Sequence, residues 1–62
     1  MYHLQAKEKK AKNAEWETIK DCLREYEIGG YYAVSKKETG HFWNYRVIDD
    51  NGNVILTTEK TK

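Results

Sequence analysis

The residues of this chain that could do chemistry are few and lie far apart. The strongest candidates are the histidines His3 and His41 and the single cysteine, Cys22. Structural zinc sites pair their ligands at short spacings, and no two of these three residues are close in sequence. A catalytic cysteine needs a base beside it, and nothing in the sequence places His41 there. The sequence therefore predicts no metal site, no cofactor and no catalytic residue, so we expect a protein that is not an enzyme and a buried Cys22.

Residues 49–53 (Asp-Asp-Asn-Gly-Asn) resemble the start of a calcium-binding loop. The match fails because Val54 stands where that loop needs glycine, and Lys60 stands where it needs glutamate. The pair Asn51-Gly52 predicts a two-residue type I′ hairpin turn instead. Gly29-Gly30 is too short for a phosphate-binding loop and is not followed by lysine and a hydroxyl residue. We accordingly expect no small-molecule substrate.

The composition indicates a small domain with a thin core. The chain has 62 residues, of which 39% are hydrophobic and 34% are charged. The hydrophobic fraction is below the roughly 45–50% of an average domain, and the charged fraction is above the roughly 25% of an average domain. Small scaffolds of this kind often gain stability from a partner. With one cysteine, no signal-peptide pattern and no apolar run near the ~18 residues of a membrane span, we expect a cytoplasmic protein that does not engage a membrane.

The clearest helix pattern covers residues 13–28. Its apolar side chains recur at spacings of three and four, which predicts one buried stripe: Trp16, Ile19, Leu23 and Tyr26. Asn13 is a suitable N-cap, and Gly29-Gly30 are expected to end the helix.

Residues 31–58 are expected to form a three-stranded meander. Residues 31–35 and 41–48 are rich in strand-forming types, with 38–40 as a hairpin loop, and residues 54–58 return as the third strand. Residues 1–12 fit an edge strand or a mobile basic segment, and residues 59–62 are expected to fray.

A rival interpretation makes residues 2–8 and 14–20 two strands and moves the helix to about 22–38. Against it, Trp16 and Ile19 would face opposite sides of a strand, and two glycines would lie inside a helix. Both interpretations give a single α+β domain over residues 1–62. It has one amphipathic helix on one face of a small antiparallel sheet of three to four strands joined by hairpins.

One helix cannot cover both faces of the sheet, so the second face is the predicted partner site. The two-residue turn places Val47 opposite Leu56 and Ile48 opposite Ile55. The face with Trp43, Tyr45, Val47, Val54 and Leu56 is expected to receive the helix. The other face is expected to hold a patch with the composition of an interface centre: Tyr32, Phe42, Arg46, Ile48 and Ile55. Alternatively, residues 1–12 or a second copy of the chain cover this patch.

A basic segment supports a second hypothesis, binding of nucleic acid. Its lysines could contact phosphates, and they are Lys7, Lys9, Lys10 and Lys12. Phe42 or Trp43 could stack on bases. The sequence pI of about 7.8 is low for such a protein.

The size, the charged ends and the hairpin at Tyr45–Ile55 give the chain a resemblance to the small accessory proteins of phages and mobile elements. The resemblance implies a protein that binds, and in some cases inhibits, a host protein or enzyme complex. A non-catalytic protein–protein interaction module is therefore the leading hypothesis, with nucleic-acid binding and a structural homodimer as alternatives.

Overall fold

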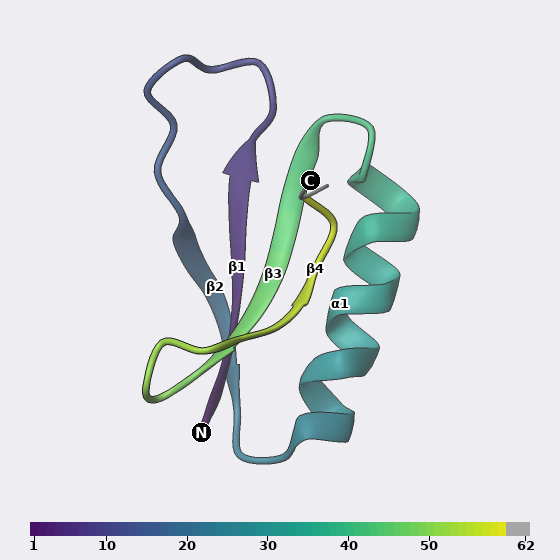
Figure 1. Cartoon of the computed structure of the whole chain (residues 1–62). Helices are drawn as coiled ribbons and strands as arrows, with labels where there is room; N and C mark the ends of the chain where they lie inside the picture. Colours follow the sequence, from purple (N-terminus) through teal and green to yellow (C-terminus); the bar gives the residue numbers. More distant parts are fainter. Residues whose placement is uncertain (60–62) are drawn as a thin grey trace.

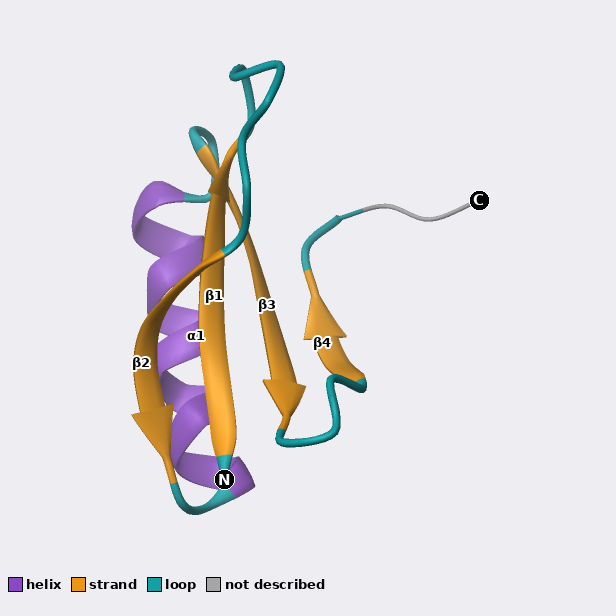
Figure 2. Ribbon diagram, turned by 90° about the vertical axis from the view of Figure 1, so that its left-hand side faces the viewer, coloured by secondary structure: helices purple, strands orange, loops and turns teal. Residues whose placement is uncertain are grey.

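Four strands and one helix form the protein, for which a computed structural model describes residues 1–59. In chain order they are β1 (Tyr2–Glu8), β2 (Glu17–Cys22), α1 (Glu25–Thr39), β3 (Trp43–Asp49) and β4 (Val54–Thr57). The strands form one antiparallel sheet in the order β2-β1-β3-β4 (Figure 1). Helix α1 covers one face of this sheet, as Figure 2 shows. The predicted α+β class is confirmed, while the expected fraying of 59–62 falls mostly on residues outside the described part of the chain.

The helix lies later in the chain than the pattern at residues 13–28 predicted. Residues 17–22 form β2, and α1 occupies residues 25–39, close to the rival interpretation. Three members of the expected stripe are consequently exposed: Ile19 (51%), Leu23 (75%) and Tyr26 (71%). The stripe that α1 buries is centred instead on Ile28 and Tyr32, one helical turn apart.

The two glycines expected to stop the helix lie inside it. No neighbouring atom lies within 4 Å of a Cβ built at Gly29 or Gly30, so neither glycine is required by a close contact. Each costs about 1 kcal/mol relative to alanine. Burial of Ile28 and Tyr32 offsets this cost, because each large side chain removed from water contributes on the order of 2 kcal/mol.

Charges at both helix ends also suit its observed position. Acidic side chains, Glu25 and Glu27, lie in the first turn, and Lys36 and Lys37 lie in the last. Both placements complement the helix dipole. The helix ends at Gly40, whose φ of −62° is right-handed and whose N–H donates to the Lys36 carbonyl. The predicted hairpin loop at residues 38–40 is therefore wrong, and residues 31–35 are helical instead of forming the first strand of a meander.

The core lies between α1 and the helix-facing side of β1 and β3. Leu4 pairs with Val47 and Ala6 with Tyr45, and all four are buried with Ile28 and Tyr32 from α1 and Cys22 from β2. The Tyr45 hydroxyl hydrogen-bonds the Thr39 hydroxyl at the end of α1. Residues 1–12 thus contribute a central strand, β1, rather than an edge strand or a mobile segment.

The β3–β4 hairpin uses a different turn from the predicted one. A type I′ turn needs positive φ at both central residues, but Gly52 (φ 83°) has the only positive φ among residues 1–59. The Gly52 N–H donates to the Asp49 carbonyl and the Asp49 N–H to the Asn53 carbonyl, which gives a three-residue loop. Ile48 therefore pairs with Val54, and a bulge restores the predicted pairing of Val47 with Leu56.

Candidate functional site

The five residues of the predicted partner patch do not share a face. Tyr32 is buried in the core, where burial raises the pKa of its hydroxyl. Ile55 packs against the same core, because the bulge turns it toward the helix side. Arg46 and Ile48 lie on the opposite, open face of the sheet, and Phe42 lies in the loop before β3. The expectation of one apolar patch around Arg46 is therefore corrected.

The open face around Arg46 is instead a polar arrangement that satisfies itself. The Arg46 Nε donates to the Gln5 side-chain oxygen (2.7 Å), and the Gln5 amide donates to the Thr18 hydroxyl (3.2 Å). The Arg46 guanidinium and the Lys7 ammonium lie 4.4 and 4.8 Å from the centroid of the Trp16 ring. These side chains tie β2, β1 and β3 together, so they account for this face without a partner.

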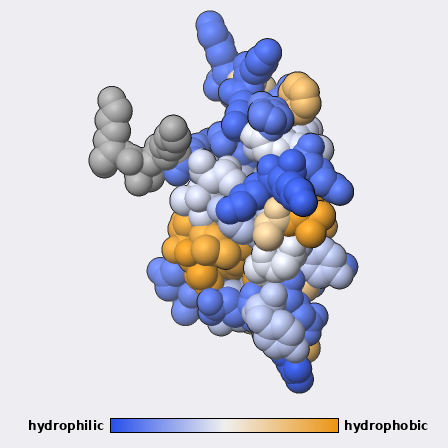
Figure 3. All heavy atoms as spheres, turned by 90° about the vertical axis from the view of Figure 1, so that its right-hand side faces the viewer, coloured by the Kyte–Doolittle hydropathy of each residue, from blue (hydrophilic) through white to orange (hydrophobic). Residues whose placement is uncertain are grey.

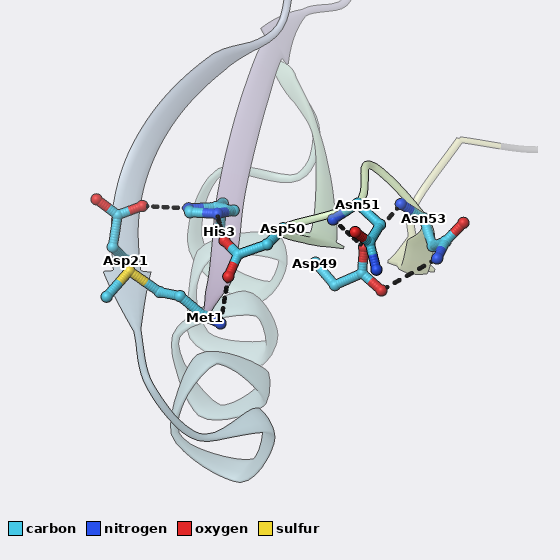
Figure 4. Close-up of polar contacts among 7 residues, drawn as sticks. All are labelled: Met1, His3, Asp21, Asp49, Asp50, Asn51 and Asn53. Atoms are coloured by element: carbon cyan, nitrogen blue, oxygen red, sulfur yellow. Dashed lines mark hydrogen bonds and ion pairs between the residues drawn. The ribbon is translucent and has the colours of Figure 1, made fainter.

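A second polar cluster gathers at the other end of the open face, around His3 (Figure 4). The His3 Nδ1 lies 2.6 Å from Asp21 and Nε2 lies 2.8 Å from Asp50, whose other oxygen accepts from the Met1 ammonium. The hydrogen bond to Asp21, and then the one to Asp50, raises the pKa of His3. Bonds from the Met1 ammonium and then His3 lower the pKa of Asp50. Both ring nitrogens have a carboxylate partner, so His3 on β1 connects Asp21 on β2 with Asp50 in the β3–β4 turn. We call this cluster the His3 clasp.

The Asp49 carboxylate organises the β3–β4 turn. One oxygen accepts from the backbone N–H groups of Asn51 and Asn53, and the other accepts from the Asn53 side-chain amide (Figure 4). The bond from the Asn53 backbone is the main reason that the pKa of Asp49 is lowered. The carboxylate is thus used to hold the turn, as the turn interpretation of residues 49–53 expected.

The described residues were compared with the arrangements that metal sites and pockets require. Within residues 1–59 no group of three or more potential ligands is arranged to hold a metal ion, and these residues enclose no pocket. In the same part of the chain no helix is long and apolar enough to cross a membrane. Cys22 is buried in β2, in agreement with the expectation of a small buried hydrophobe, although it does not lie on a helix.

Among residues 1–59, the apolar surface that α1 leaves uncovered is the edge formed by β4. Helix α1 packs against β1, β2 and β3 but not against β4. Leu56 lies on the helix side and is 38% exposed because the helix does not reach it, while Val54 lies on the open face and is 51% exposed. Figure 3 shows a patch of apolar atoms on the side of the molecule where this strand lies, next to polar side chains. We call Val54, Leu56 and the outward backbone of Thr57 the β4 edge.

The two edges of the sheet differ in how they are protected. Strand β2 carries Glu17, Lys20 and Asp21 along its length, and a bulge interrupts its pairing with β1. Charges and bulges are the usual means of preventing further strand pairing. Strand β4 has the sequence Val-Ile-Leu-Thr without a charged residue, although it too has a bulge. The less protected edge is therefore β4, because it carries no charged residue.

Sequence reasoning placed Val54 and Leu56 under the helix and so missed this edge. The exposure of Leu56 depends on β1 entering the centre of the sheet, because the helix then lies over β1 and β3 and leaves β4 outside. Val54 is exposed because its pairing with Ile48 places it on the open face. The sequence signal for this edge was the absence of charged residues in Val54–Thr57, because charged side chains are one of the features that oppose pairing of an edge strand with a further strand.

The chain was compared with protein families, curated proteins and solved structures. No family model, curated protein or solved structure matches the chain. The function is therefore argued from the geometry of the described residues alone.

Proposed function

We propose that the protein is a non-catalytic interaction module that binds an extended segment of a partner protein as an additional strand beside β4. The observation that carries this proposal is the uncharged, apolar edge that α1 leaves uncovered. Edge strands present a row of unpaired N–H and C=O groups, and extended peptides bind such rows by continuing the sheet.

The backbone of β4 is oriented for this role. The Thr58 N–H donates to the Tyr45 carbonyl and therefore points into the sheet. Alternation along an antiparallel strand then turns the N–H and C=O of Thr57 outward. Val54 pairs with Ile48 and Leu56 with Val47, so these two side chains lie on opposite faces of the sheet. An added strand would gain backbone hydrogen bonds from the edge and an apolar contact on each face.

The side chains favour an uncharged partner segment with apolar residues at alternate positions. A second copy of the chain fits less well, because β4 is short and each copy would bring its own bulge into the new pairing. A regular extended segment meets only one bulge.

The test is a selection of linear peptides on the folded protein, followed by binding measurements on variants. Val54→Lys places a charge on the edge and is expected to abolish binding, since edge lysines oppose strand pairing. Val34→Lys is the matched control: Val34 is similarly exposed (55%) but lies on α1. It is expected to leave binding unchanged.

A backbone variant separates strand addition from simple apolar contact. Thr57→Pro removes the outward N–H at a position where an edge strand tolerates proline. Thr57→Ala is its control, because both changes remove the hydroxyl that accepts from the Glu59 N–H. Peptide binding that survives Thr57→Pro contradicts the proposal. A concentration-dependent dimer that Val54→Lys dissociates would identify a second copy as the occupant and would also contradict it.

A further inference from the structure

Two loops that are distant in sequence meet at the end of the sheet opposite the β3–β4 turn. One connects β1 to β2 over residues 9–16, and the other connects α1 to β3 over residues 40–42 (Figure 1). The Lys9 N–H donates to the Phe42 carbonyl at 3.0 Å, which fixes the first loop against the second. Glu8 pairs with Trp43 directly beside this bond.

The first loop supplies positive charge. Lys9, Lys10 and Lys12 are exposed, and within residues 1–59 none of them forms an ion pair. Lys7, which precedes the loop, pairs with Glu59 at 2.9 Å and lies over the Trp16 ring.

The second loop supplies aromatic rings. Phe42 is 65% exposed and Trp43 is 37% exposed, and both belong to the segment that Lys9 contacts. Large apolar rings held in water beside free lysines are the combination found in proteins that bind single strands. Cations follow the phosphates there, and bases stack on the rings.

We propose that this end of the molecule binds single-stranded nucleic acid, with Lys9, Lys10 and Lys12 at the phosphates and Phe42 as the stacking platform. This site is separate from the β4 edge, so the two can be tested independently. An acidic polypeptide would satisfy the lysines equally well, but it would leave the Phe42 ring without a partner. Glu15 within the loop and Glu8 beside it repel phosphates and limit the affinity, while the lysine contacts make the affinity dependent on salt.

The experiment measures the affinity for a fluorescent oligothymidylate of about 12 nucleotides, within the range of known single-strand sites, against salt concentration. The variant Lys9→Gln/Lys10→Gln/Lys12→Gln is expected to make the log–log salt slope shallower by about 2, because each phosphate contact on a single strand contributes about 0.7. The control variant Lys20→Gln/Arg24→Gln removes cations away from both loops and is expected to change the slope little.

The ring is tested separately from the charge. Phe42→Ala is expected to weaken binding roughly tenfold with an unchanged salt slope, because stacking is not an ionic contact. Tyr26→Ala removes an exposed aromatic ring from α1 and is expected to have no effect. No binding at low salt, an unchanged slope in the lysine variant, or equal competition by a polyglutamate peptide would each overturn the proposal.

Discussion

The fold perturbs the protonation of the His3 side chain. It donates to Asp21 and Asp50 only when both ring nitrogens carry protons, and these bonds raise its pKa. Below the unfolded-state pKa of about 6.5 the imidazolium is present in both states, and the clasp contributes fully to stability. As pH rises through the higher folded-state pKa, the proton and this contribution are lost.

We therefore expect His3→Gln to lower the melting temperature most at about pH 5–6, and progressively less as the pH rises from about 6.5 through the folded-state pKa. The measurement is thermal unfolding of both proteins across this range, with His41→Gln as a control outside the clasp. A His3→Gln effect of constant size at all these pH values would show that the clasp is not ionic.

Ile28 and Leu23 distinguish the observed helix from the one expected at residues 13–28. Ile28 is fully buried and Leu23 is 75% exposed. Ile28→Ala is expected to cost about 2–5 kcal/mol, enough to unfold much of a small domain, whereas Leu23→Ala is expected to stay within about 0.5 kcal/mol. Urea unfolding measures both. The reverse order would mean that the stripe at Trp16, Ile19, Leu23 and Tyr26 forms the core.

At the scale of elements, the helix glycines offer the clearest test. Gly30→Ala meets no neighbouring atom and is expected to stabilise the protein by about 0.5–1 kcal/mol through helix propensity. The same substitution at Gly40 would bring its Cβ onto the Lys36 carbonyl oxygen. It is expected to destabilise the protein by roughly 1–3 kcal/mol. Equal signs for the two changes in urea unfolding would contradict the helix boundaries.

The elements also show where sequence reasoning succeeds and where it fails. The α+β class and a turn within residues 49–53 follow from local patterns. The turn type does not, and Val47 reaches Leu56 through a bulge instead of through the expected two-residue turn. The helix position does not, because Ile19, Leu23 and Tyr26 fit a helical period although residues 17–22 pair with β1. The observed fold instead depends on long-range strand pairing, such as that of Leu4 with Val47. Local sequence patterns do not predict such a contact. The predicted site failed for the same reason, since its faces depended on which strand is central.

The whole molecule combines an open sheet face whose polar side chains bond to one another with a sheet edge, β4, that has no charged residue and is not covered by the helix. Arg46 on β3 contacts Gln5 on β1 and Trp16, which directly precedes β2, and the Asp49 turn and the His3 clasp lie at the far end. The β4 edge is the place where the sheet stops without charge or cover. The proposed strand addition would extend the sheet there without disturbing the core, so we expect binding to need no conformational change.

The most direct test of this account is hydrogen exchange at the Thr57 amide, with and without a peptide selected on the folded protein. In the free protein this N–H faces water and is expected to exchange quickly, while the Thr58 N–H, which is bonded to Tyr45, exchanges slowly. Binding is predicted to protect Thr57 and to leave the amides of residues 9–16 unchanged. An unprotected Thr57 amide in the saturated complex would contradict strand addition at β4.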